Sequence, residues 1–173
     1  PKLKKRVSTS IKDLPSKKDS VGKVGILLMR SYVLSGDTAH YDAVISELES
    51  MNLQVIPAFS ASLDSRPAIN EFFYVSDKLN VDCILSLTGF SLVGGPAYND
   101  SKAAEDILSK LDVPYIAAHA LEFQTLPNWQ ENDIGLGPVE TTMLVALPEI
   151  DGAIVPTVFG GRMAHGLEMQ PSI

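Results

Sequence analysis

The chain has 173 residues, 45% of them apolar, and a formal net charge of −7. This length suits one domain with a buried core. No apolar run approaches the roughly 20 residues of a membrane-spanning helix, and none follows the basic N-terminus as it would in a signal peptide. The single cysteine, Cys83, lies in an apolar run and has no partner for an internal disulfide. We therefore expect a buried thiol and a reducing compartment, either the cytoplasm or a plastid stroma.

The charge is unevenly distributed along the chain. Residues 1–20 contain seven Lys/Arg and two Asp, a net charge of +5, while the rest contains seven Lys/Arg and nineteen Asp/Glu, a net charge of −12. An acidic body argues against a nucleic-acid-binding surface. The basic segment has little apolar content, so we expect a flexible polar linker.

The first strand is predicted at residues 24–29, a continuous apolar run typical of a strand buried on both faces. Residues 35–37, Ser-Gly-Asp, favour a helix start, and apolar residues then recur at helical spacing as far as Asn52. A second strand is predicted at residues 54–59. Its Pro57 cannot donate a ladder hydrogen bond, which indicates an edge position.

The alternation of strands and helices then continues to the C-terminal region. Further strands are predicted at residues 81–87, 113–118 and 153–159. Apolar residues at helical spacing predict three further helices. The first contains Ile69, Phe72, Phe73 and Leu79, the second Ala104, Ile107, Leu108 and Leu111, and the third Val139, Met143, Ala146 and Leu147. Residues 163–173 have no clear period and are expected to form an irregular tail or the start of a further segment.

Strands that alternate with helices predict a parallel sheet covered by helices on both faces. Five strands and four helices fit a flavodoxin-like, doubly wound α/β domain over residues 21–162. Counted in chain order, the expected strand order is 2-1-3-4-5.

Ligands of such sheets bind beyond the carboxyl ends of the strands, where the strand order reverses. This point lies between the first and third strands, so the loops at residues 30–40 and 88–100 should form one crevice, with residues 119–124 nearby. Both loops exceed the usual βα connection of about 2–6 residues, which favours a functional role. The residues expected to face the crevice are Arg30, Ser31, Thr88, Gly94, Gly95, Tyr98, Asn99 and Gln124.

Several common sites do not fit these loops. Gly89 and Gly94 have the glycine spacing of a phosphate-binding loop, but Gly95-Pro96 replaces the lysine and hydroxyl residue that it requires. The sequence has no Cys/His cluster with zinc-site spacing and no G-x-S-x-G motif. A flavin site remains open, because residues 35–38, Ser-Gly-Asp-Thr, partly supply a loop rich in hydroxyl groups and glycine.

Two crevice residues have alternative interpretations. His40 falls near a helix start, where it is either a packing imidazole or a proton acceptor that titrates near neutral pH. Arg30 either pairs with Asp37 or holds a ligand carboxylate with its planar guanidinium.

Four blocks of the sequence, in the same order along the chain, resemble the large-subunit family of magnesium and cobalt chelatases. They are residues 24–41 (VGILLMRSYVLSGDTAHY), 86–100 (SLTGFSLVGGPAYND), 112–125 (DVPYIAAHALEFQT) and 147–162 (LPEIDGAIVPTVFGGR). The run GGPAYND is closer to the large magnesium chelatase subunits of chlorophyll and bacteriochlorophyll synthesis than to the cobalamin branch.

The resemblance implies a subunit that binds protoporphyrin IX and receives Mg²⁺, while partner subunits of the AAA+ type hydrolyse ATP. Family subunits are several times longer, so this chain is expected to be a fragment that is inactive alone. Alternatives are a cobalt chelatase subunit or a non-catalytic docking module.

The resemblance assigns no catalytic residue. Metal insertion requires a base for the pyrrole protons and oxygen ligands for a strongly hydrated Mg²⁺ ion. From their expected position we propose His40 and Glu122 as proton acceptors and Asp100 as a metal ligand.

Overall fold

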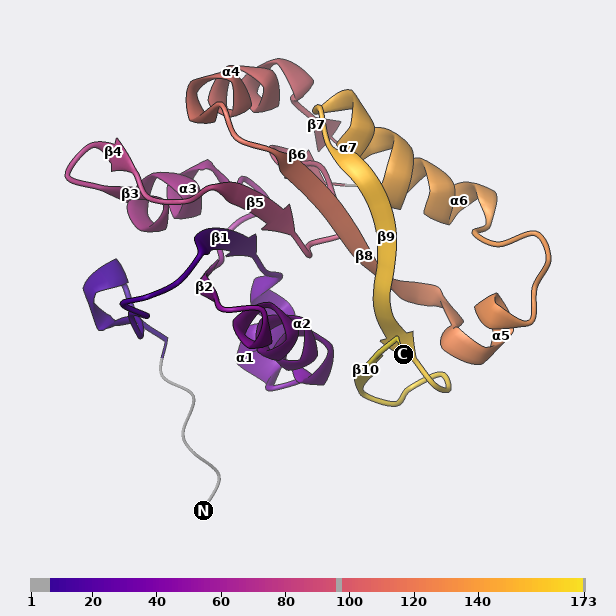
Figure 1. Cartoon of the computed structure of the whole chain (residues 1–173). Coiled ribbons are helices and arrows are strands. Elements are labelled where there is room, and N and C mark those ends of the chain that lie inside the picture. Colours follow the sequence, from indigo (N-terminus) through magenta and orange to yellow (C-terminus); the bar gives the residue numbers. More distant parts are fainter. Residues whose placement is uncertain (1–6, 96–97, 173) are drawn as a thin grey trace.

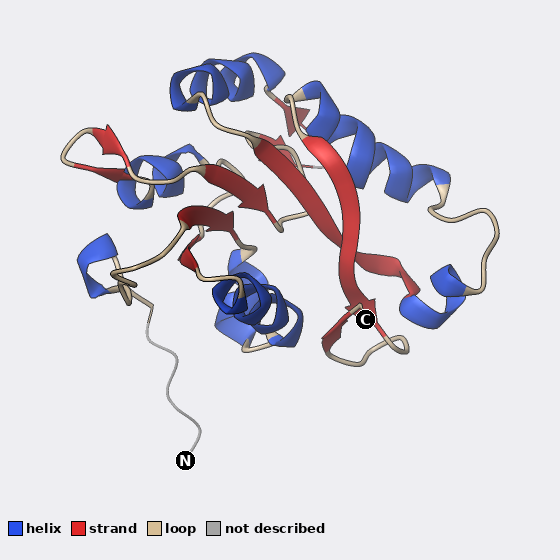
Figure 2. Cartoon of the chain, in the orientation of Figure 1, coloured by secondary structure: helices blue, strands red, loops and turns tan. Residues whose placement is uncertain are grey.

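Five strands lie parallel in one twisted sheet, and a sixth runs antiparallel at its edge (Figures 1 and 2). The computed structural model of the protein describes residues 7–95 and 98–172. The sheet contains β1 (Gly22–Leu27), β2 (Leu53–Ala58), β5 (Cys83–Ser86), β8 (Tyr115–Thr125), β9 (Ile154–Arg162) and β10 (Met169–Pro171). Their order is β10-β9-β8-β5-β1-β2. Apart from β10 this is the predicted order 2-1-3-4-5, so the flavodoxin-like doubly wound fold is confirmed.

Helices cover both faces of the sheet (Figure 1). α1 (Arg30–Ser35) and α2 (Ala39–Ser50) lie on one side, and α3 (Arg66–Phe72) and α4 (Ser101–Leu111) on the other. A long helix near α4 is built from α6 (Pro138–Glu140), the π-helical η2 (Thr141–Ala146) and α7 (Leu147–Ile150). Smaller elements are η1 (Ile11–Asp13), α5 (Leu126–Gln130) and the hairpins β3 (Tyr74–Val75)–β4 (Lys78–Leu79) and β6 (Gly94–Gly95)–β7 (Tyr98–Asn99). Within the described residues, no helix has the length and apolar character needed to cross a membrane.

The alternation of side chains along β1 divides the core between the two faces. Ile26 packs with Tyr41 of α2, whereas Leu27 packs with Ile69 of α3. Gly25 lies on the α3 side, where a Cβ atom would be 2.7 Å from the Phe73 ring, so only glycine lets this ring close over the strand.

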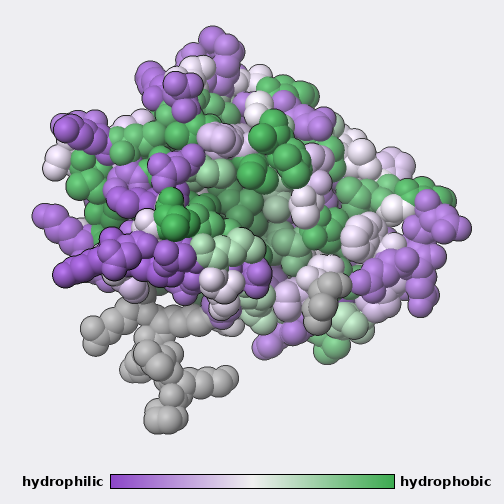
Figure 3. All heavy atoms as spheres, in the orientation of Figure 1, coloured by the Kyte–Doolittle hydropathy of each residue, from purple (hydrophilic) through white to green (hydrophobic). Residues whose placement is uncertain are grey.

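Apolar side chains also reach the surface. Figure 3 shows them toward the middle of one face, with hydrophilic residues at its margins. Among the exposed large apolar residues are Phe123, Ile134, Val139 and Ile150.

The predicted extension of the second helix, the one that contains Ile69, to Leu79 was wrong. α3 ends at Phe72, and the chain turns into the β3–β4 hairpin, whose turn residues Ser76 and Asp77 both have positive φ. Short polar residues tolerate this left-handed conformation, which favours a tight hairpin.

Both predicted crevice loops contain secondary structure. Residues 30–40 include α1, which ends at Gly36 with φ of 81°, and residues 88–100 include the β6–β7 hairpin. β8 continues to Thr125, so residues 119–124 belong to the strand itself.

The two ends of the described chain pack against the domain. The tail predicted to be irregular contains β10, in which Met169 is fully buried and donates its N–H to Asp37 Oδ1 (2.8 Å). Of the predicted linker, residues 1–6 lie outside the described residues. Ile11 and Leu14 are partly buried against the core.

Candidate functional site

The loops after β1, β2 and β5 meet at the carboxyl edge of the sheet and enclose a cavity of about 170 Å³. Four of the predicted crevice residues lie in its wall, namely Arg30, Ser31, Thr88 and Gly94. The two loops singled out from the expected strand order therefore share one cavity. We call it the polar cavity, because six of the described serine and threonine residues and Arg30 lie among the apolar residues of its wall.

Sequence reasoning missed the third wall, which is the loop after the edge strand β2. This loop contributes Ser60, Ser62 and Ser65 to the polar cavity. The strand order reverses between β1 and β5, and the loop follows β2, which is neither of these two strands. The only signal was the density of serines in the run Phe59–Arg66 (FSASLDSR).

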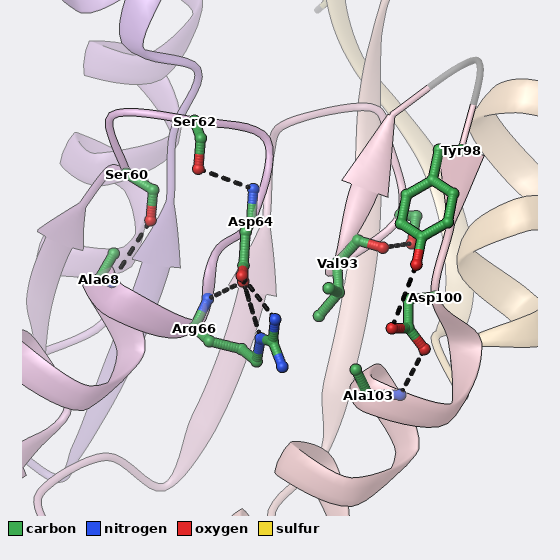
Figure 4. A network of polar contacts seen from close by, with 10 residues as sticks. Ser60, Ser62, Asp64, Arg66, Ala68, Val93, Tyr98, Asp100 and Ala103 are labelled. Carbon is green, nitrogen blue, oxygen red and sulfur yellow. Dashed lines mark hydrogen bonds and ion pairs between the residues drawn. The ribbon is translucent and has the colours of Figure 1, made fainter.

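The β2 loop is held in shape by its own polar contacts (Figure 4). Arg66 forms an ion pair of 2.7 Å with Asp64, and its hydrogen bonds lower the pKa of that carboxyl group. The Ser62 hydroxyl accepts from the Asp64 N–H (3.3 Å), and the Ser60 hydroxyl accepts from the N–H of Ala68 in α3 (3.3 Å). These contacts stabilise one backbone conformation of the loop that carries the serines of the cavity wall.

A buried carboxylate anchors the loop that follows β5, which we call the glycine-rich loop. Asp151, which is 3% exposed at the end of α7, accepts hydrogen bonds through Oδ2 from the Ser91 hydroxyl (2.6 Å) and the Leu92 N–H (2.7 Å). Asp151 lies about 60 residues from its partners, so spacing gave no indication of this contact. Another predicted residue, Asn99, has its Oδ1 2.8 Å from the Ser91 hydroxyl.

The remaining hairpin residues lie beside the polar cavity. Gly94 has φ of 128°, and a Cβ atom there would collide with the Tyr98 carbonyl, so the hairpin requires glycine. Gly95, Tyr98 and Asp100 line an adjoining open groove of about 400 Å³, which shares Ser62, Leu63 and Gly94 with the polar cavity.

Asp100 has a structural role in this arrangement. It caps α4 by accepting the Ala103 N–H (3.0 Å), and it lies 3.4 Å from the Tyr98 hydroxyl (Figure 4). In the described part of the chain, His, Cys, Asp and Glu side chains form no group of three or more that could hold a metal ion.

His40 does not face the crevice as expected. It is fully buried, with its ring stacked on Phe159 and close to Tyr41 and Tyr32. Neither ring nitrogen has a hydrogen-bond partner among the described residues, and burial lowers the pKa of His40 to about 4. The packing interpretation therefore describes this imidazole, and a base role would require it to move.

Glu122 lies nearer to the crevice. Its exposed carboxylate accepts a hydrogen bond of 2.5 Å from the Tyr32 hydroxyl, and both residues line a small cavity of about 50 Å³ together with Thr88 and Phe90. Burial, together with this hydrogen bond, raises the pKa of Tyr32.

The side chain of Gln124 forms hydrogen bonds outside the polar cavity. Its amide donates to the buried Glu140 (2.5 Å) and to the Gly135 carbonyl (3.3 Å). It therefore stabilises the connection before α6 and does not line the polar cavity.

The chain is similar to known proteins over nearly its whole length. A family model described as CobN/Magnesium Chelatase matches residues 2–172. The magnesium-chelatase H subunit of Cereibacter sphaeroides is 59% identical over 162 residues, and that of Rhodobacter capsulatus is 57% identical. These matches cover 94% of this chain and 14% and 13% of the relatives. CobN, an aerobic cobaltochelatase subunit of Pseudomonas aeruginosa, is 30% identical over 140 residues, which are 80% of this chain and 11% of the relative.

A solved structure has the same fold. The catalytic subunit of cobaltochelatase from Mycobacterium tuberculosis superimposes with a TM-score of 0.66 at 22% identity, over 92% of this chain and 14% of that one. The chain thus spans 11–14% of the length of these relatives.

Proposed function

Because the chain belongs to the CobN/magnesium chelatase family, we propose that it is an α/β domain of a magnesium chelatase H-type subunit. The observation that carries this proposal is the identity of 57–59% to two H subunits over 94% of the chain, against 30% to a cobaltochelatase subunit. The subunit would bind protoporphyrin IX and receive Mg²⁺ as substrates, with ATP hydrolysed by AAA+ partner subunits.

The polar cavity would contribute substrate binding. Porphyrin propionates are carboxylates, which a guanidinium such as that of Arg30 binds through paired charge-assisted hydrogen bonds. The hydroxyl groups of Ser31 and Thr88 supply further donors in the same wall.

Glu122 is our proposed proton acceptor. Pyrrole protons must leave as the metal enters, and Glu122 offers an exposed carboxylate beside Thr88, whereas His40 is enclosed. The Tyr32 hydroxyl would position this carboxylate through its hydrogen bond.

A chimera tests the proposed function. The matching segment of the Cereibacter sphaeroides H subunit, which is 59% identical, is replaced by this chain, and Mg-protoporphyrin formation is measured with the partner subunits and ATP. We expect activity within about tenfold of the parent, since a domain from the same kind of subunit should preserve the transition state to about 1.4 kcal/mol. The control chimera carries the matching segment of Pseudomonas aeruginosa CobN and should be much less active. A folded chimera of this chain that is no more active than the CobN control would contradict the proposal and favour the cobalt branch.

A further inference from the structure

A second, larger cavity of about 600 Å³ lies on the β2 side of the polar cavity. The two cavities have five wall residues in common, so they adjoin; these are Leu28, Arg30, Phe59, Ser60 and Ala61. We call the larger one the apolar chamber.

The wall of the apolar chamber comes from three parts of the chain. The end of β2 contributes Pro57, Ala58 and Phe59, and α3 contributes Ala68 and Phe72. The N-terminal segment contributes Val7 and Leu14. The segment at residues 7–14, whose composition predicts a polar linker, is thus one wall of an apolar space.

Within the described part of the chain, two charged residues line this double cavity, Arg30 and Glu71. Arg30 is exposed and lines both parts, at the junction between hydroxyl groups and apolar side chains. Asp37, the neighbour with which Arg30 could have paired, instead contacts Arg162 (3.6 Å) and the Met169 N–H. The other charged wall residue among those described is Glu71 of α3, which is also exposed.

We propose that the double cavity binds an amphipathic carboxylate, with the carboxylate at Arg30 in the polar cavity and the apolar body in the chamber. The volume of the chamber falls within the roughly 300–1,000 Å³ typical of small-molecule pockets, which combine an apolar lining with a few polar anchors. Burial of the apolar body against Phe59 and Phe72 provides affinity, and Arg30 fixes the orientation. This inference rests on the proposed function in that a tetrapyrrole propionate is one such ligand. It adds that the binding site lies on the β2 side, with Val7 and Leu14 in its wall. A tetrapyrrole ring held there lies apart from Glu122, which lines a different cavity, so Glu122 would act only after the ring has moved toward Thr88.

The test fills the junction of the two cavities. Ala61 is exposed and lines both of them, so Ala61→Trp should obstruct the site without overpacking the core. The whole chain is titrated with deuteroporphyrin IX, and binding is followed by the shift of the Soret band. We expect Ala61→Trp to weaken binding at least about tenfold, a loss of about 1.4 kcal/mol, and the control Ala164→Trp, at another exposed alanine, to bind as the unmodified chain does.

A second pair of measurements tests the role of the charge. Arg30→Ala should weaken binding of the porphyrin diacid but hardly change binding of its dimethyl ester, because the ester lacks the charge that Arg30 contacts. Lys78→Ala, at an exposed lysine of β4, is the control and should change neither affinity.

The outcomes separate this site from the proposed function. Porphyrin binding that is equal in Ala61→Trp and Ala164→Trp would overturn the site and leave the result of the chimera unaffected. Binding of a fluorescent long-chain fatty acid, lost in Ala61→Trp, with no porphyrin binding would support the amphipathic carboxylate and count against a tetrapyrrole. Failure of both probes to bind at about 100 µM, an affinity weaker than about −5.5 kcal/mol, would refute the proposal.

Discussion

Two buried histidines give the stability of the folded chain a dependence on pH. His40 and His119 are at most 2% exposed, and their ring nitrogens have no hydrogen-bond partners among the described residues. Burial lowers the pKa of each to about 4, because the protonated imidazole is poorly solvated there. Both are thus neutral packing groups over most of the physiological range.

This burial makes stability depend on pH in a defined window. Between about pH 6.5 and 4 the unfolded chain binds protons at these positions while the folded chain does not, so the free energy of unfolding falls as pH falls. The loss should be roughly 2–3 kcal/mol for each histidine. Urea unfolding at several pH values measures it.

Substitution identifies the source of this slope. His40→Phe keeps the aromatic contacts with Tyr41 and Phe159 but cannot be protonated, so it should reduce the slope between pH 6.5 and 4 by about half, with His119 supplying the rest. His165→Gln, at an exposed histidine, should leave the slope unchanged. Equal slopes in both variants would show that His40 does not contribute.

At the scale of elements, the glycine-rich loop is held by a residue about 60 positions away in the sequence. Asp151 joins the end of α7 to Ser91 and Leu92, which lie between the polar cavity and β6. The shape of the cavity is therefore coupled to the helix that precedes β9.

We expect Asp151→Ala to lower the free energy of unfolding by roughly 2–4 kcal/mol, because it leaves buried donors without an acceptor. The amide hydrogens of Leu92 and Gly94 should also exchange faster with solvent. Asp133→Ala, at an exposed aspartate, is the matched control. If the two variants are equally stable and exchange alike, Asp151 does not hold the loop.

The order of strands in the sheet was predictable because each buried strand is a short apolar run. Runs such as residues 24–29 and 81–87 match β1 and β5 to within about two residues at each end. The β3–β4 hairpin was not predictable in this way, because Phe73 and Leu79 fit a helical stripe as well as a strand. β10 was missed because its position is set by the distant Asp37.

For the candidate site, the sequence allowed us to predict which two loops meet, but not how their side chains pack. Strand order brought Arg30, Ser31 and Thr88 to one cavity. It could not show that His40 lies beneath Phe159, since that depends on tertiary packing of β9. Nor could it show that the β2 loop and residues 7–14 complete the walls.

At the scale of the whole molecule, the chain is one folded domain of a family whose members are much longer. It covers about 14% of the Cereibacter sphaeroides H subunit. Its double cavity is lined by loops, the end of β2 and α3 of this chain, so it can be tested both in the chain and within a complete subunit.

In the proposed function, Arg30 and the polar cavity take part in binding the chelatase substrate. The most direct measurement is the kinetics of Mg-protoporphyrin formation by the Cereibacter sphaeroides chimera with Arg30→Ala, beside the same chimera with Lys78→Ala. Because Arg30 would hold a carboxylate that does not react, we expect KM for protoporphyrin to rise about tenfold or more with kcat little changed, and Lys78→Ala to have no effect. Identical kinetics for the two variants, in chimeras that fold equally well, would contradict the account.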